Sequence, residues 1–343
     1  MINISLADFS HKKELTELWV NAFNDGEKFV SSFLGAYMIP EYNAPVIIDS
    51  GKIASALYLI DFPLYSNTNR LGTCAYLFAA ATREDCRNKG YMSKLVSYSA
   101  ELCKNRGLKA VFLFPQNQNQ KLFDFYSKFG FKTIYAAKKI VRDGAHDVPR
   151  ISASSASSSS SSSSSSNFKL TDKDITDVDI FDRLYDSYVE FTAKQELAPV
   201  KDRLFFFRCA SAYLEGPGSR FAVFEKTEKI HGKNAENTYN VDKFCYVFYK
   251  KYKNTYYIDD IILSEYTDIK QNSQIKYEEM ADILADFILN SGENVNLEMN
   301  VLTSSFADSQ NVPLAMILPL SDDVKNITDN LKSPVYINMF MNI

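Results

Sequence analysis

The pattern of hydrophobic and polar positions in the first 141 residues predicts short strands that alternate with amphipathic helices. Apolar side chains at helical spacing predict two early helices, one with Leu15, Leu18, Trp19 and Phe23 and one with Phe29, Phe33, Leu34 and Tyr37. Apolar runs predict strands at residues 2–6, 46–48, 53–60, 74–82, 110–114 and 131–141, with further helices at 92–106 and 120–129. The predicted order βααβββαβαβ indicates an α/β (α+β) fold with a mixed central sheet flanked by helices.

The second half of the chain repeats this pattern more faintly. Helical spacing recurs at residues 180–192, 203–213 and 277–290, and strand-like runs occur at residues 221–225, 244–249, 256–263, 295–299 and 335–341. We therefore expect the first fold to be present twice in tandem, with the second copy degenerate.

A run of almost pure serine separates the two halves. Residues 154–166 are all serine except Ala156. Such a run has nothing to bury, so it is either a mobile tether or a placeholder for unassigned sequence. With 343 residues, about two domains are expected, and we predict boundaries at 1–145, 146–167 and 168–343.

Charge and cysteine content narrow the classes of function. The net charge of −4 argues against a general nucleic-acid binder. Residues 1–150 carry +5 and the remainder −9, so the first half suits a polyanionic cofactor. The acidic second half would attract a cationic substrate or is simply a solvated surface.

Five cysteines and three histidines show no zinc-binding spacing, so we expect no metal and reduced cytosolic thiols. No apolar run approaches the ~20 residues that span a bilayer. The prediction is therefore a cytoplasmic protein with no membrane partner.

The segment with the clearest chemistry joins a buried strand to a helix at residues 82–93. Its backbone N–H groups from Arg87 to Ser93 would surround the positive end of the helix, which is a ready anion site. Gly90 would allow close approach of a ligand, and Arg87 and Lys89 would add positive charge. An ordinary surface turn would have the same composition.

The sequence Arg87-Asn88-Lys89-Gly90 resembles the start of the R-x-x-G-x-G/A signature of GNAT N-acetyltransferases. Tyr126, four residues before Gly130-Phe131, resembles the second signature of that family, at the family's helix–strand–helix spacing. Met92 departs from the signature's second Gly or Ala. A bulkier residue there is similar to the enhanced-intracellular-survival branch, which has a second GNAT-like domain and a sterol-carrier-like domain, for which this chain is too short.

The resemblance implies that the first domain binds acetyl-CoA. In the family, the strand before the signature splays from its neighbour and pairs with the pantetheine arm, and the turn holds the pyrophosphate. The matching positions for the arm are Ala80, Ala81 and Thr82, and those for the pyrophosphate are Arg87, Asn88, Lys89, Gly90, Tyr91, Met92 and Ser93. Asn119 is a further coenzyme-binding candidate, or equally a helix N-cap.

Tyr126 matches the family's general acid. A departing CoA thiolate has a conjugate acid with a pKa of ~8.5, and a phenol with a pKa of ~10 stays protonated at neutral pH and can donate to it. The alternative is a tyrosine packed under the sheet. No base is evident, since Glu27 and Glu41 are only loosely placed, and the C-terminal carboxylate of Ile343 matches a group of the enhanced-survival branch.

The second domain has no equivalent signature, because residues 264–268 are acidic and lack glycine. We expect it to bind no CoA and to shape the acceptor cleft. The leading hypothesis is an acyl-CoA-dependent N-acetyltransferase that acts on a small-molecule or peptide amine. The alternatives are a non-catalytic CoA-binding or protein-interaction module and an enzyme that transfers a longer acyl group.

Overall fold

The chain folds into two compact units, each built from both halves of the sequence. The computed structural model describes residues 2–37, 44–115, 119–143, 167–231, 238–263, 284–289, 295–303 and 311–331. Unit 1 comprises Met1–Ile134 with Pro313–Leu331, and unit 2 comprises Tyr135–Val312 with Lys332–Ile343. The predicted boundaries near residues 145 and 168 therefore do not describe this exchange of segments.

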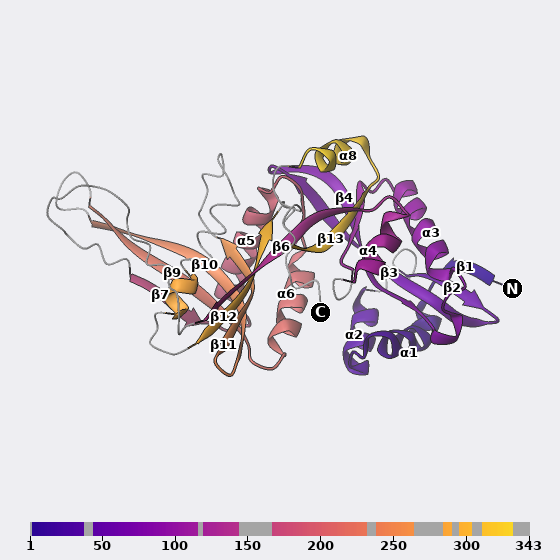
Figure 1. Cartoon of the computed structure of the whole chain (residues 1–343), viewed down its shortest axis with the longest axis horizontal. Helices are drawn as coiled ribbons and strands as arrows, with labels where there is room; N and C mark the ends of the chain where they lie inside the picture. The colour runs from indigo at the N-terminus through magenta and orange to yellow at the C-terminus, as the bar shows by residue number, and fades with distance from the viewer. Residues whose placement is uncertain are drawn as a thin grey trace. The chain divides into compact units, whose positions relative to one another are not determined.

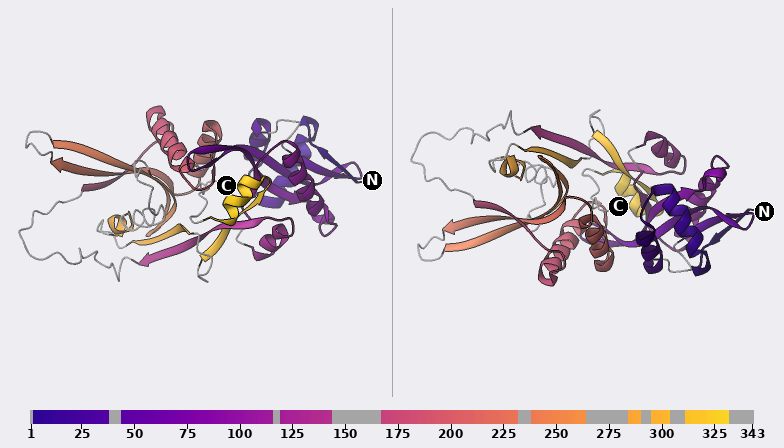
Figure 2. Two further views of the ribbon diagram at one scale, coloured as in Figure 1. Left: turned by 90° about the horizontal axis from the view of Figure 1, so that it is seen from above. Right: turned by 90° about the horizontal axis from the view of Figure 1, so that it is seen from below.

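The sheet of unit 1 has the order β1-β2-β3-β4-β5-β13. Its strands are β1 (Ile2–Leu6), β2 (Pro45–Asp49), β3 (Lys52–Ser66), β4 (Asn69–Thr82), β5 (Ala110–Leu113) and β13 (Asn311–Pro319). All neighbours are antiparallel except β4 and β5, which are parallel. In Figures 1 and 2, yellow β13 lies among the indigo and magenta elements of unit 1.

Helices cover both faces of this sheet. On one face pack α1 (Lys12–Phe23) and α2 (Glu27–Tyr37), around Trp19, Leu34 and Tyr58. On the other face pack α3 (Tyr91–Asn105) and α4 (Gln120–Ser127), around Leu77, Leu95 and Phe123. Because side chains alternate along a strand, successive residues of β3 and β4 supply the two cores. The short α8 (Asp322–Asp329) follows β13.

The sheet of unit 2 has the order β6-β12-β11-β10-β9-β7. Its strands are β6 (Lys132–Asp143), β7 (Asn167–Asp172), β9 (Ser219–His231), β10 (Thr238–Tyr252), β11 (Thr255–Leu263) and β12 (Asn296–Thr303). Unit 2 also contains β8 (Ala198–Pro199), α5 (Val178–Ala193), α6 (Arg203–Leu214) and a helical segment at residues 284–289. Asp177 and Asp202 cap α5 and α6 by accepting hydrogen bonds from backbone N–H groups, which explains where both helices begin.

The two sheets have the same sequence of strand directions. Read from β7 to β6, unit 2 has three antiparallel pairs, one parallel pair and one antiparallel pair, as unit 1 has from β1 to β13. This second sheet region is consistent with the predicted tandem copy. In each unit the last strand comes from the other half of the sequence, since β13 completes unit 1 and β6 pairs with β12 in unit 2.

The predicted strands and α-helices of the first half are confirmed in order from β1 to β6, and two short 3-10 helices at Phe9–His11 and Glu84–Cys86 were not anticipated. The predicted helices and strands of unit 2 that fall on described residues are also present. The sequence analysis did not anticipate β7, β8, β13 or α8. The serine run, the turn at residues 264–268 and the predicted strand at residues 335–341 lie outside the described residues.

Candidate functional site

The turn between β4 and α3 has an open, uncapped helix start. Gly90 is the N-cap residue of α3 and adopts φ 75°, ψ 12°, and Asn88 also has a positive φ of 63°. The N-cap residue Gly90 has no side chain that could cap the helix, so the first N–H groups of α3 receive no hydrogen-bond acceptor from it. A Cβ on Gly90 would meet no atom within 4 Å, so its φ, and not crowding, favours glycine.

The predicted turn residues differ in where their side chains lie. Arg87, Asn88 and Lys89 are exposed, and Arg87 Nη1 lies 4.0 Å from Glu84 Oε1. Met92 is half-buried and packs against the core on the α3 face of the sheet. The residue that departs from the signature is therefore accommodated by core packing.

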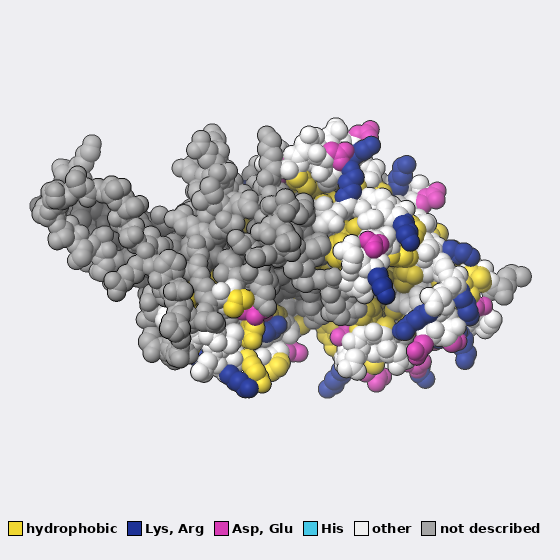
Figure 3. Space-filling view, viewed as in Figure 1, with side chains coloured by type: hydrophobic (Ala, Val, Ile, Leu, Met, Phe, Trp, Pro, Cys, Tyr) yellow, Lys and Arg dark blue, Asp and Glu magenta, His cyan; other side chains and the backbone are white. Residues whose placement is uncertain are grey.

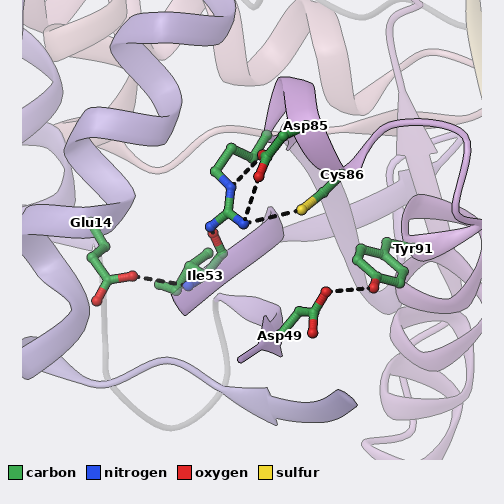
Figure 4. A network of polar contacts seen from close by, with 7 residues as sticks. Glu14, Asp49, Ile53, Asp85, Cys86 and Tyr91 are labelled. Carbon is green, nitrogen blue, oxygen red and sulfur yellow. Dashed lines mark hydrogen bonds and ion pairs between the residues drawn. The ribbon is translucent and has the colours of Figure 1, made fainter. Parts of the chain in front are cut away.

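Tyr91 turns its side chain away from the open turn. It is 5% exposed, and its hydroxyl donates to Asp49 Oδ2 at 2.8 Å (Figure 4). This hydrogen bond lowers the pKa of Asp49 and raises the pKa of Tyr91. Only the backbone N–H of Tyr91 faces the helix start.

A β-bulge in β4 precedes the turn. Tyr58 pairs with Phe78 and Ala56 with Ala81, so Leu57 of β3 lies opposite two residues, Ala79 and Ala80. Ala79 has a positive φ of 45°, which is rare for a residue with a Cβ. The register of β4 with β5 covers only Ala75 and Tyr76 among the described residues, so the end of β4 diverges from β5.

The end of β4 is bonded to β3 through Ser55. The Ser55 hydroxyl donates to the Ala81 carbonyl at 2.9 Å and lies 2.8 Å from the Thr82 hydroxyl. These two groups already have protein partners. Of the three residues predicted to pair with the pantetheine arm, Ala80 is therefore the one with no such bond from Ser55.

The Tyr126 side chain lies in the core between α4 and the sheet. It is 7% exposed, and its ring contacts Phe125 and Phe131 with centroid distances of 5.0 and 5.7 Å. Burial raises the pKa of Tyr126 to about 12. The phenol therefore stays protonated throughout the neutral range, and it is a weaker acid than an exposed tyrosine.

Residues 3–134 match the family model described as an acetyltransferase (GNAT) domain. These residues form a GNAT acetyltransferase domain. No curated protein matches the sequence.

Several solved structures share the fold over nearly the whole chain. A probable N-acyltransferase from Enterococcus faecalis is 13% identical, with a TM-score of 0.65 over 93% of this chain and 73% of that one. A GCN5-related N-acetyltransferase from Anabaena variabilis is 11% identical, with a TM-score of 0.60 over 94% and 73%. Eis1 from Mycobacterium abscessus is 9% identical, with a TM-score of 0.60 over 94% and 75%. At these identities the likeness shows a shared fold over nearly the whole chain, and the predicted tandem-GNAT type is consistent with that fold.

The remaining predicted residues of the GNAT domain have mixed outcomes. Asn119 is the N-cap of α4, and its side chain accepts from the Lys121 N–H at 3.0 Å. Glu27 is exposed in the first turn of α2. Glu41 and Ile343, the other candidates for the base, lie outside the described residues.

An open cleft of about 770 Å³ lies beside the turn, between α1, the start of β3 and the end of β4. Its charged lining residues are Lys13, Glu14, Glu17, Lys52, Arg83, Glu84, Asp85 and Arg87. Basic and acidic side chains are also interspersed over the face of unit 1 in Figure 3. The basic character predicted for the first half is therefore balanced locally by carboxylates.

The sequence analysis missed Arg83, which organises the entrance to the turn. Its guanidinium donates to Asp85 Oδ1 and Oδ2 at 2.5 and 3.1 Å, to the Ile53 carbonyl at 3.2 Å and to Cys86 Sγ at 3.2 Å (Figure 4). The pKa of Asp85 is lowered by this pairing. The only sequence signal was an arginine two residues before an aspartate.

The part of the chain that the structure describes shows no candidate metal site and no candidate membrane-spanning helix. There, His, Cys, Asp and Glu side chains form no group of three or more that could hold a metal ion. Among the same residues, no helix has the length and apolar character needed to cross a bilayer.

Proposed function

We propose that the GNAT domain transfers an acetyl group from acetyl-CoA to a primary amine of a small molecule or peptide. The observation that carries the proposal is the uncapped start of α3 after a bulged strand that diverges from its parallel neighbour. The residues present fit the coenzyme, because the helix start offers N–H groups and a positive dipole end to a pyrophosphate.

In this proposal each part of the coenzyme has its own protein partners. The N–H groups of Gly90 to Ser93 hold the pyrophosphate, and Arg87, Asn88 and Lys89 line its exposed side. The edge of β4 at Ala80 lies along the pantetheine arm, where small side chains leave room. The divergence of β4 from β5 leaves backbone groups of this edge for the arm, as in the addition of a strand to a sheet.

The chemistry is a direct acyl transfer. The amine attacks the thioester carbon, a C–N bond forms, the C–S bond breaks, and the sulfur leaves as a thiolate. Tyr126 donates its hydroxyl proton to the sulfur. Because burial raises the pKa of Tyr126 to about 12, well above the ~8.5 of a thiol, this proton donation alone is unfavourable. We therefore propose that the two proton transfers are coupled. The attacking amine gives a proton to the Tyr126 oxygen as Tyr126 gives its own proton to the sulfur, so that the phenol is restored.

Turnover measurements on Tyr126→Phe test the catalytic role. We expect kcat for release of free thiol from acetyl-CoA to fall about 100-fold, with coenzyme affinity within a factor of two of wild type. The Phe ring preserves the packing against Phe125 and Phe131, so the melting temperature is the control. An unchanged kcat would remove Tyr126 from the mechanism.

A CoA titration of Gly90→Glu tests the coenzyme site. A ligand that binds only the folded state raises the melting temperature with concentration. We expect the wild type to be stabilised by CoA and Gly90→Glu not to be, because a carboxylate would face the pyrophosphate. A wild type that shows no stabilisation at millimolar CoA would overturn the proposed function.

One observation favours the alternative of a non-catalytic CoA-binding module. The Tyr126 ring is enclosed by aromatic neighbours, as expected for a tyrosine that only packs under the sheet. CoA binding without thiol release across a broad amine panel would support this second function.

A further inference from the structure

Both ends of the turn between β4 and α3 are hydrogen-bonded to the β2–β3 hairpin. At the entrance, Arg83 donates from its guanidinium to the Ile53 carbonyl at the start of β3, and from its backbone N–H to the Ala54 carbonyl at 2.9 Å. At the exit, Tyr91 donates to Asp49 at the end of β2. Figure 4 shows the Tyr91 contact with Asp49, and Asp85 and Cys86 on the side of Ile53.

Helix α1 also makes a hydrogen bond to this hairpin. Glu14 of α1 accepts a hydrogen bond from the Ile53 N–H at 2.9 Å. Side chains from α1 and from the turn thus bind both backbone groups of Ile53. The entrance to the turn is consequently fixed to the sheet and, through Ile53, to a helix on its far face.

The Arg83 contacts need the shape of a guanidinium and not only its charge. Its two-point pairing with Asp85 closes the short 3-10 turn at Glu84–Cys86, while a third nitrogen reaches Ile53. Lysine has a single ammonium group and cannot make this planar, forked arrangement. These partners of Arg83 lie in the hairpin or at the entrance of the turn, and none of them is Gly90 or a residue of α3.

We propose that Arg83 and Asp49 are positioning residues, which hold the anion-binding turn in the geometry that receives the coenzyme phosphates. This inference rests on the proposed function. Ordering the turn before the ligand arrives removes part of the entropic cost of binding. Neither residue needs to touch the coenzyme, so their effect is on coenzyme affinity and not on the chemical step.

The test compares Arg83→Lys with a matched control in the same unit. Arg106, the C-cap residue of α3, forms an ion pair with Asp61 of β3 through Nη2 and Oδ2, so Arg106→Lys is the same substitution at another guanidinium–carboxylate contact with the sheet. We measure CoA affinity by calorimetry, and amide hydrogen exchange of residues 84–93 without ligand. We expect Arg83→Lys to weaken CoA binding about tenfold and to speed exchange in that segment, and Arg106→Lys to do neither.

Two substitutions of Asp49, one milder than the other, test the contact with Tyr91 at the exit of the turn. Asp49→Asn keeps an oxygen that accepts from Tyr91, whereas Asp49→Ala removes the acceptor. We expect Asp49→Asn to retain affinity within a factor of about three and Asp49→Ala to lose about tenfold, with kcat at saturating acetyl-CoA unchanged in both.

Three results would overturn the inference: unchanged CoA affinity in Arg83→Lys, equal losses in Arg83→Lys and Arg106→Lys, or a fall in kcat without a change in affinity. Failure of the proposed function looks different, because the wild type itself would then bind no CoA. Even in that case, the exchange measurement reports whether Arg83 orders the turn.

Discussion

The two units each have a β-bulge in a corresponding strand, β4 in unit 1 and β11 in unit 2, but the residues in the two bulges differ in size and charge. In unit 1 the bulge of β4 consists of Ala79 and Ala80. In unit 2 the register of β10 with β11 slips between Phe248 and Tyr249, which leaves Asp259 as the extra residue. Each strand thus has one extra residue, but Ala79 has a positive φ and Asp259 does not, and the side chains differ in size and charge.

The acidic bulge of unit 2 is occupied by its own protein partners. Asp259 accepts from the Tyr213 hydroxyl at 2.8 Å and pairs with Lys250 Nζ at 3.3 Å. The next residue, Asp260, is 1% exposed and interacts electrostatically with the buried Lys201. The corresponding position in unit 1 has the small, half-buried side chains of Ala79 and Ala80, whereas in unit 2 it has an aspartate with two protein partners. A bulge by itself is therefore no indication of a coenzyme site.

The two units also differ in the number of residues through which the bulged strand pairs with its parallel neighbour. β11 pairs with β12 at four positions, Thr255 to Ile258, whereas β4 pairs with β5 at two, Ala75 and Tyr76. The longer pairing leaves less of the edge of β11 available to a ligand. That the second copy binds no CoA stays a prediction, because its sequence evidence in residues 264–268 lies outside the described residues.

The largest expected effect is the loss of CoA affinity when the bulge of unit 1 is given an aspartate like that of unit 2. Ala80→Asp places a carboxylate on the half-buried edge of β4, in the path proposed for the pantetheine arm. We expect CoA affinity to fall at least about 100-fold, because a desolvated charge would face an anionic ligand. Calorimetric titration measures this. Ala80→Ser is the control of similar size without charge, and equal losses in the two variants would show that space and not charge decides.

The buried lysine of unit 2 provides a pH test of intermediate size. Lys201 is 1% exposed, and burial lowers its pKa to about 8, below its unfolded value of ~10.4. Between these values the unfolded state binds more protons, so the free energy of unfolding of unit 2 should rise with pH from 8 to 10.

We expect this rise to be on the order of 1–3 kcal/mol in urea titrations, and smaller in Lys201→Met. Comparison of the two proteins cancels the contribution of the tyrosines, which begin to ionise in the unfolded chain near pH 10. An equal rise in both would show that Lys201 does not titrate in this range.

The smallest expected effect comes from removing the acid of the unit 2 bulge. Asp259→Ala deletes the acceptor of the Tyr213 hydroxyl and an ion pair that is partly exposed. We expect a loss of about 1 kcal/mol in the free energy of unfolding, and CoA binding that stays at one site per chain. A second equivalent of bound CoA would mean that the acidic bulge alone blocks the site in unit 2.

Local patterns were sufficient to predict the elements of the first half and the position of the turn between β4 and α3. Apolar periodicity and the glycine at position 90 are local signals, and the structure places Gly90 at the start of α3 in the conformation that glycine favours. The positions of Arg87, Asn88 and Lys89 in the turn could be predicted for the same reason, although their role in binding stays a prediction.

The contacts that fix the turn could not be predicted, because they join residues far apart in the sequence. Asp49 and Tyr91 are 42 residues apart, and Arg83 and Ile53 are 30 apart. The strand β13 was missed for a similar reason. Its sequence, with Pro313 and Pro319, has weak strand character, and its partner β5 lies some 200 residues earlier.

The exchange of last strands also constrains how this protein is made and how it can evolve. While the ribosome is still synthesising the second half, the first half has all its signature residues but leaves the edge of β5 unpaired until β13 emerges. An unpaired edge strand invites association with other chains. A gene truncated after the first half would encode the whole anion-binding turn and still yield an incomplete sheet. Selection for unit 1 therefore acts on β13 as well as on the first half of the sequence.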